Sequence, residues 1–200
     1  MNPPSERQYV LRCLIKTPHS EFKIPHDLSW SEPMIKACFN KQVEMGINQP
    51  FCYITIRHGV VSTKLDDEWH VDGFSMTITH LPEQNYAWCS QNGTEYIKKA
   101  IEIPKDFNPL IYNIHNFIQD SITPEDEVNV FKNKTIYCFD PYVIHRRPIN
   151  VAGQVRTFVR VSFTPIEIND VNNTYNPLIK TNYTRDGKKD FRDKLLRYPK

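Results

Sequence analysis

The sequence predicts a mainly β domain with flanking α-helices, of the double-stranded β-helix class (a jelly-roll, cupin-like fold). Its length of 200 residues suits one domain with a sizeable core. Helix-like patterns occur before residue 50, whereas β-branched and aromatic residues dominate the segments after it. Helices followed by roughly seven or eight short strands favour two packed sheets over an alternating α/β arrangement.

We expect a single domain over residues 1–200, with N-terminal helices over about 1–48, a jelly-roll core over about 50–168 and a basic tail over about 170–200. Residues 5–15 are a weak helix candidate. Residues 29–46 are a stronger one, because Ser31 can cap the helix, Pro33 suits its first turn and Gly46 can end it. One face of this second helix is striped by Met34, Ala37, Cys38 and Val43.

The later segments are typical of strands. We expect strands over residues 51–63, 74–81, 85–90, 134–140, 142–146 and 155–168. Asp140-Pro141 predicts a tight turn between two of them. Residues 108–121 fit either a helix or a buried strand, and the pattern does not decide between them.

Composition gives no positive indication of several broad classes. The net charge of +2 is too small to indicate nucleic acid or a membrane as the partner. No apolar run approaches the roughly 18–20 residues of a membrane span, and the first residues lack the apolar core of a signal peptide. The five cysteines are scattered and form no CxxC pair, so we expect reduced, buried thiols in a cytoplasmic protein.

Three residues suggest a metal site. His70 and Asp72 stand two residues apart among bulky apolar neighbours, and His145 closes a later apolar segment. Two histidines and one carboxylate form a facial triad, which binds Fe(II) on one face and leaves three positions open. Open positions are typical of a catalytic site rather than a structural one. The alternative interpretation is a hydrogen-bonded structural pair at His70 and Asp72, with His145 as a core histidine.

A row of polar residues follows the third candidate ligand. Arg156, Phe158, Arg160 and Ser162 have even spacing, so in a strand they share one face. If that face is interior, the arginines need an anion, because arginine is almost never buried unpaired. A dicarboxylate would satisfy them. The alternative is that both arginines point outward and pair with surface acids.

With His70-x-Asp72, His145 and an arginine 11 residues later, the chain resembles the Fe(II)- and 2-oxoglutarate-dependent oxygenases over about residues 50–168. The resemblance implies that these three residues bind Fe(II) and that Arg156 or Arg160 binds the distal carboxylate of 2-oxoglutarate, with Arg156 as first choice. Arg160-Val161-Ser162 is similar to an Arg-x-Ser signature of some branches, which adds Ser162 to the cosubstrate site.

The resemblance further implies a reaction. In such a reaction 2-oxoglutarate and molecular oxygen give succinate and carbon dioxide, and a substrate is hydroxylated or demethylated. We expect a small-molecule substrate such as an amino acid or other metabolite, with nucleic acid possible but not favoured and the oligomeric state open. The alternatives are a cupin-type metalloenzyme without 2-oxoglutarate, an oxygenase that modifies nucleotides or nucleic acids, and a non-catalytic module that binds carboxylate or phosphate.

Overall fold

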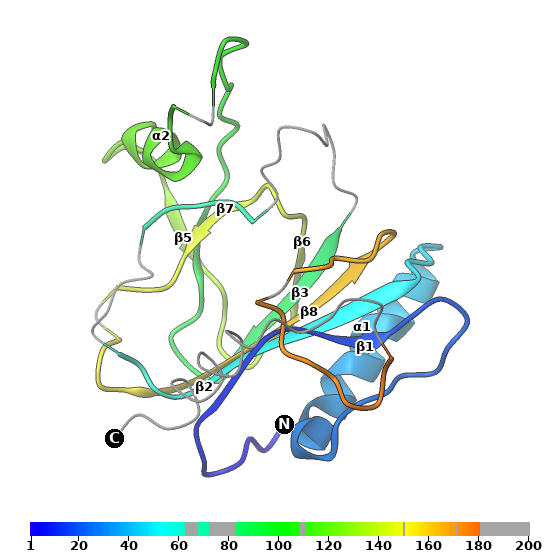
Figure 1. Cartoon of the computed structure of the whole chain (residues 1–200). Helices are drawn as coiled ribbons and strands as arrows, with labels where there is room; N and C mark the ends of the chain where they lie inside the picture. The colour runs from blue at the N-terminus through cyan, green and yellow to red at the C-terminus, as the bar shows by residue number, and fades with distance from the viewer. Residues whose placement is uncertain (63–67, 73–82, 109–110, 150, 171, 181–200) are drawn as a thin grey trace.

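The structure is a computed structural model that describes residues 1–62, 68–72, 83–108, 111–149, 151–170 and 172–180. Two antiparallel sheets face each other, and helices lie at the outside (Figure 1). The larger sheet has the strand order β1-β2-β8-β3-β6 and the smaller one the order β5-β4-β7. The prediction of a mainly β chain with flanking helices and two sheets is therefore confirmed.

The larger sheet is built on two long neighbouring strands. β2 and β8 pair through ten consecutive residues, from Phe51 opposite Thr164 to Val60 opposite Val155. The strands of this sheet are β1 (Gln8–Lys16), β2 (Phe51–Val60), β3 (Gln84–Cys89), β6 (Tyr137–Phe139) and β8 (Val155–Thr164). β8 lies between β2 and β3, so it is covered along both edges and, as expected of a central strand, on both faces.

The smaller sheet consists of short strands: β4 (Glu95–Ile97), β5 (Val128–Val130) and β7 (Ile144–Arg146). His70 joins it through an antiparallel bridge to His145 in β7. β4 and β5 were not anticipated, because three residues are too few to show a period-2 pattern. The expected strand over 74–81 lies outside the described residues.

The antiparallel pairs are nested along the chain. β4 pairs with β5, β3 with β6, His70 with His145, and β2 with β8, so each pair encloses the one before it. Two further pairings join alternate pairs of this series within one sheet: β3 with β8 in the larger sheet and β4 with β7 in the smaller one. The chain thus resembles one long antiparallel hairpin whose successive strand pairs belong in turn to one sheet and then to the other.

One face of the larger sheet carries the main core. A 3₁₀ helix η1 (His26–Ser31) leads into α1 (Glu32–Glu44), which packs on this face (Figure 1). The expected helix over 29–46 forms as η1 followed by α1, with Pro33 in the first turn of α1 and Gly46 just beyond its end at φ +68°. The expected cap at Ser31 is wrong, since its side chain makes no capping hydrogen bond, and of the expected stripe Met34 and Cys38 are buried whereas Ala37 and Val43 are exposed. The buried apolar cluster that joins helix and sheet includes Cys13, Ile15, Met34, Ile35, Cys38, Ile54, Ile56, Val159, Val161 and Phe163.

The expected helix over residues 5–15 is wrong. This segment forms β1, which pairs with the edge of β2 and is interrupted by a bulge around Arg12, at φ +40°. Buried residues of β1 face both sides of the sheet, with Cys13 in the main core and Leu14 in a separate cluster with Tyr53. Burial on both faces disguises the alternation that would have indicated a strand.

Other expectations are resolved by the structure. The ambiguous segment 108–121 contains a helix, α2 (Ile114–Asp120), which covers the smaller sheet through Ile118. Asp140 makes the expected turn, since its carboxylate accepts a hydrogen bond from the Tyr142 backbone N–H at 2.8 Å. All five cysteines are free, but Cys138 is exposed, so the expectation that every thiol is buried is wrong there.

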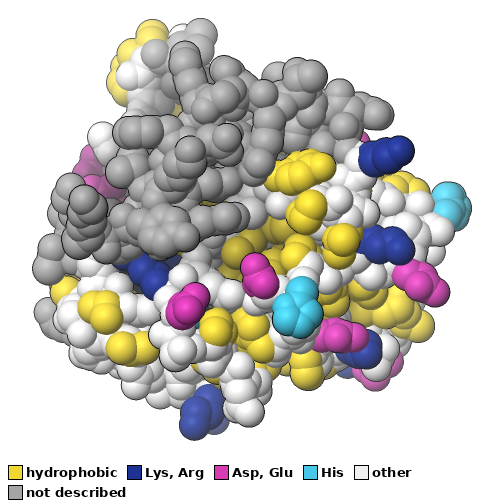
Figure 2. Space-filling model, turned by 60° about the horizontal axis from the view of Figure 1, so that its bottom comes forward, with side chains coloured by type: hydrophobic (Ala, Val, Ile, Leu, Met, Phe, Trp, Pro, Cys, Tyr) yellow, Lys and Arg dark blue, Asp and Glu magenta, His cyan; other side chains and the backbone are white. Residues whose placement is uncertain are grey.

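The chain beyond β8 returns to the larger sheet. The amide of Asn176 donates to the carbonyl oxygens of Leu14 and Lys23, both at 2.7 Å, and Ile179 packs on Leu14. Most of the expected basic tail, 181–200, lies outside the described residues. On the face shown in Figure 2, charged side chains of both signs are scattered among hydrophobic ones. Among the described residues, no helix is long and apolar enough to cross a membrane.

Candidate metal centre

A backbone bridge brings the two candidate histidines together. The N–H of His70 donates to the carbonyl oxygen of His145 at 3.0 Å, and the N–H of His145 donates back at 2.9 Å. Residues directly opposite in an antiparallel pair place their side chains on the same face. The two imidazole rings accordingly lie 4.5 Å apart between centroids.

Each histidine is oriented by a backbone carbonyl. Nδ1 of His70 lies 2.9 Å from the carbonyl oxygen of Glu68, and Nδ1 of His145 lies 2.8 Å from that of Val143. Because a carbonyl oxygen only accepts hydrogen bonds, each neutral imidazole carries its proton on Nδ1. The lone pair of each Nε2 is then available to a metal ion, with the ring fixed by the bond behind it.

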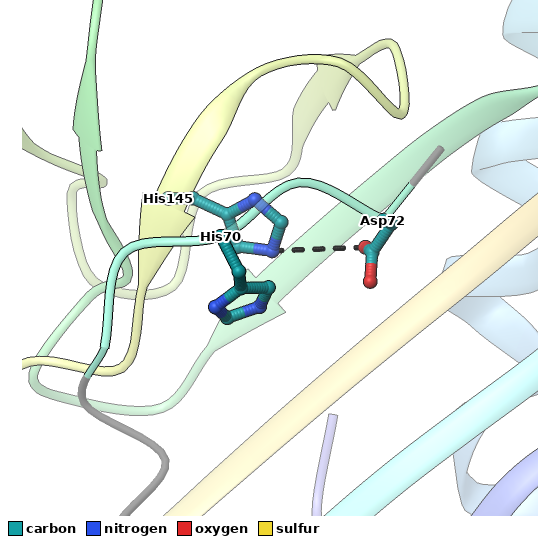
Figure 3. Close-up of side chains that lie close together, drawn as sticks. All are labelled: His70, Asp72 and His145. Carbon is teal, nitrogen blue, oxygen red and sulfur yellow. Dashed lines mark ion pairs between the residues drawn. The ribbon is translucent and has the colours of Figure 1, made fainter. Parts of the chain in front are cut away.

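Asp72 completes the group, as Figure 3 shows. Its Oδ2 lies 3.6 Å from Nε2 of His145, and one ligand atom from each of His70, Asp72 and His145 lies within 4.8 Å of the others. Donors bound to one divalent cation through bonds of about 2 Å lie about 3 Å apart when adjacent, so the three side chains would close slightly around an ion. The expected convergence of the three residues is therefore present.

The protonation states of two members suit metal binding. Burial alone would raise the pKa of Asp72, but the positive charge of Arg160, helped by His145 and His70, outweighs it and lowers the pKa to about 2. Burial lowers the pKa of His145 to about 4, although the nearby Asp72 opposes this. Near neutral pH the carboxylate is ionised and the His145 imidazole is neutral, and these are the forms that coordinate metals.

The two arginines of β8 both lie beside this group, on the face turned away from α1. Arg160 donates from Nη1 to Oδ2 of Asp72, while its Nε has no hydrogen-bond partner among the described residues. Arg156 donates from Nε to the carbonyl oxygen of Asn92 at 2.9 Å and contacts Sγ of Cys89 at 3.2 Å. The expectation that the arginine row points inward is confirmed for these two residues.

A tight turn supports Arg156. The turn between β3 and β4 contains Asn92, at φ +50°, and Gly93. A Cβ on Gly93 would lie 1.7 Å from the carbonyl oxygen of Phe131, so only glycine fits this approach. The turn thereby brings the Asn92 carbonyl and Thr94 to the Arg156 guanidinium.

A pocket of about 260 Å³ joins these residues. Its wall includes the three candidate ligands together with Arg156, Phe158 and Arg160. Ser162, the remaining predicted site residue, lies farther along β8, where its hydroxyl bonds Oδ1 of Asn85, and it is not part of the pocket wall. A role for Ser162 in cosubstrate binding stays a prediction.

Several pocket residues escaped the sequence reasoning. Arg57 and Thr55 alternate along β2, and their register opposite Phe158 and Arg160 places them on the pocket face. The alternation of polar side chains within an otherwise apolar strand was a signal, but it could be interpreted only once the pairing partner was known. Arg147 was noted as part of a basic turn, and it too lines the pocket.

Comparison of the chain with protein-family models, with curated proteins and with solved structures gives no match. The interpretation of the site therefore depends on its own residues and geometry.

Proposed function

We propose that the chain is a jelly-roll enzyme that uses Fe(II) and 2-oxoglutarate to hydroxylate or demethylate a small molecule. The observation that carries the proposal is the convergence of His70, Asp72 and His145 in one pocket with two buried arginines. The donor set is that of a three-ligand site with open positions, and the arginines provide a counter-charge for a dicarboxylate.

The nested pairing of strands supports the jelly-roll part of the proposal. A jelly roll is an antiparallel hairpin rolled so that its successive pairs alternate between two sheets. The four pairs described above alternate in this way, because β2 with β8 and β3 with β6 belong to the larger sheet, whereas His70 with His145 and β4 with β5 belong to the smaller one. The pair that carries the two histidines is enclosed by the β2–β8 pair, whose pocket face carries both arginines.

The residues present fit an iron ion. His70 and His145 have Nδ1 engaged by carbonyl oxygens and Nε2 available, and Asp72 is ionised. These three side chains would hold the metal, and iron when bound would supply the activation of oxygen that the reaction requires. Carboxylate and imidazole without thiolate disfavour a purely structural zinc site, which usually closes its sphere with four ligands.

The cosubstrate is assigned to Arg156 rather than Arg160. Arg160 already bonds Asp72, so it orients that carboxylate and keeps it ionised. Arg156 is held by a carbonyl, a thiol and a hydroxyl, and no carboxylate among the described residues pairs with it. A buried guanidinium without an acid partner suits the distal carboxylate of 2-oxoglutarate. The free thiols are compatible with the reducing cytoplasm as the place of action.

The first test measures metal binding and turnover separately. Mn(II), added anaerobically as an inert substitute for Fe(II), should raise the thermal midpoint of the metal-free protein. At a metal concentration a hundred times the dissociation constant, binding should raise the free energy of unfolding by about 3 kcal/mol. With Fe(II), oxygen and 2-oxoglutarate, the protein should release succinate. His145→Ala should lose both responses, whereas Arg156→Ala should keep the Mn(II) response and lose succinate release.

A matched histidine provides the control. His115 lies on α2 with its ring centroid 5.8 Å from that of His70, but it does not belong to the converging group. His115→Ala should therefore retain both responses. Succinate release that survives His145→Ala would contradict the ligand assignment. A protein that responds to Mn(II) but never consumes 2-oxoglutarate would instead indicate a cupin-type metalloenzyme.

A further inference from the structure

Arginines from four elements line the metal pocket. β8 contributes Arg156 and Arg160, and β2 contributes Arg57. The segment at the end of β7 adds Arg146 and Arg147, and the approach to β1 adds Arg7. The proposed iron and 2-oxoglutarate sites involve only the two arginines of β8. The others are unexplained by the proposed function.

The strand register gathers part of this charge on one face. Arg57 stands directly opposite Phe158, the residue between Arg156 and Arg160, so its side chain shares the pocket face with theirs. Arg156 stands opposite Gly59, which has no side chain. The space that a Cβ of Gly59 would fill is occupied by the Arg7 side chain, whose Cγ would lie 2.8 Å from it. Arg7 thus lies across β2 beside Arg156.

Arg147 lines the same pocket from the smaller sheet. Its Nη1 lies 3.4 Å from the carbonyl oxygen of Ser62, just after β2, which is a long hydrogen bond. Its Nε is buried and has no hydrogen-bond partner among the described residues. A buried donor left without an acceptor is costly, so it indicates a ligand that the pocket is built to receive.

Among the described residues, few acidic side chains lie near the arginines of the pocket. Arg146 pairs with Glu95 at 2.7 Å and Arg160 pairs with Asp72, which is the only acid among the described residues of the pocket wall. No carboxylate among the described residues lies within ion-pair distance of Arg7, Arg147 or Arg156. Burial lowers the pKa of Arg156, and the charges of Arg57 and Arg147 lower it further, so these guanidinium groups repel one another.

We propose that Arg57 and Arg147 form a second anion subsite in the metal pocket, distinct from Arg156, and that the primary substrate is a small organic anion held there by its acidic group. Its identity as a substrate site rests on the proposed function. The existence of the anion subsite does not, because it follows from the arginines alone.

The dimensions favour a small molecule over a nucleic acid. The pocket measures about 260 Å³, below the roughly 300–1,000 Å³ of sites for drug-sized ligands, and part of it would hold 2-oxoglutarate. A nucleic-acid backbone is recognised by many phosphate contacts spread along a groove. Here the arginines converge on one cavity, and the whole chain has a net charge of only +2.

The test uses inorganic phosphate and acetate as probes. Each is titrated at low ionic strength into the full-length, metal-free protein that contains saturating 2-oxoglutarate, and binding is followed by calorimetry. Arg147→Gln and Arg57→Gln should each weaken binding of the preferred probe about tenfold or more, the size expected when a charge-assisted hydrogen bond is lost. The probe that binds more tightly indicates whether the substrate carries a phosphate or a carboxylate.

Lys36→Gln is the matched control for net charge. Lys36 is an exposed residue of α1, on the far side of the larger sheet, so its loss should change probe affinity by less than twofold. Wild-type protein that binds neither probe, or arginine variants that bind as tightly as the wild type, would overturn the subsite. Arg147 is only two residues from His145, so Arg147→Gln could disturb folding there. Arg57 lies on another strand, and Arg57→Gln therefore tests the subsite independently of such a defect.

The two proposals fail separately. Loss of the subsite is detected by calorimetry without metal, whereas failure of the oxygenase is detected by the Mn(II) and succinate measurements. Phosphate or acetate binding that depends on Arg57 and Arg147 supports the subsite even in a protein that releases no succinate. Dependence of probe binding on Lys36 instead would indicate a diffuse charge effect and would also overturn it.

Discussion

Both faces of β8 are largely buried, but they differ in the kinds of contact that their side chains make. On the face toward α1, Val159, Val161 and Phe163 are at most 1% exposed and contact other apolar side chains. On the opposite face, Arg156 and Arg160 are 7% and 8% exposed and line a pocket. The side chains of the first face contact apolar neighbours, whereas on the second face Nε of Arg160 has no hydrogen-bond partner within the described part of the chain.

This difference separates stability from chemistry within one strand. Burial of apolar area stabilises the fold without further partners. Burial of guanidinium groups costs free energy unless an anion is present. The buried arginines of the pocket face therefore lower the free energy of unfolding, and residues that lower stability in this way are typical of functional sites.

The largest effect should come from the helix-side face. Phe163 packs in the main core, with its ring centroid 5.9 Å from that of Tyr86 and edge-on to it. Phe163→Ala should lower the free energy of unfolding by about 3–5 kcal/mol, the cost of a large cavity in a packed core. Urea denaturation of the metal-free protein measures it.

Phe158 is the matched control for this substitution. It lies on the same strand but faces the pocket, is only partly buried, and lies 5.5 Å from the Arg156 guanidinium. Phe158→Ala should cost about 1–2 kcal/mol, since less apolar area returns to water. Equal losses in the two variants would contradict the division of roles between the faces.

The sequence predicted the pocket face better than it predicted the whole fold. Even spacing placed Arg156 and Arg160 on one face regardless of tertiary context, because the period of a strand is two. Convergence of His70 with His145 was inferred from residue types and a family resemblance, and the structure supplies the reason, a backbone bridge between the two residues.

Other features depend on pairing that no local pattern contains. Gln8–Lys16 becomes a strand because β2 offers it an edge, so tertiary context overrides a weak local preference. Arg57 belongs to the pocket only because of its register opposite Phe158. The choice between Arg156 and Arg160 was open from the sequence, and the bond from Arg160 to Asp72 is the reason that our proposal assigns the cosubstrate to Arg156.

A smaller effect is the pH dependence of stability, which the pocket residue His145 should cause and the helix-side face should not. In the metal-free protein His145 has a pKa of about 4, against an ordinary value of 6.5, because it is buried. Between these values the unfolded chain binds more protons than the native one, so the free energy of unfolding falls as pH is lowered from about 6.5 to 4. The loss should reach up to roughly 3 kcal/mol. Asp72, with a pKa lowered to about 2, adds no loss until pH falls below about 4.

Urea denaturation at several pH values measures this loss. His145→Gln should flatten the dependence over this window, since it removes the group that titrates. Val161→Ala, on the helix-side face, should instead shift the whole curve downward and keep its slope. A slope in His145→Gln as steep as that of the wild type would mean that other groups control the acid response.

The smallest effect tests whether a residue on the helix-side face of β8 contributes to stability through its strand position or through burial beneath α1. Val155 lies on the same side of β8 as Val161, but it is at the end of the strand and is 55% exposed. Its cross-strand partner Val60 is similarly exposed, at 56%. Val155→Thr should change the free energy of unfolding by less than about 0.5 kcal/mol, because a β-branched residue remains in an exposed strand position. Val161→Thr would leave a hydroxyl in the apolar core beneath α1 and should cost about 1–3 kcal/mol. Similar costs at both positions would mean that strand pairing, rather than the cover provided by α1, makes the helix-side face stable.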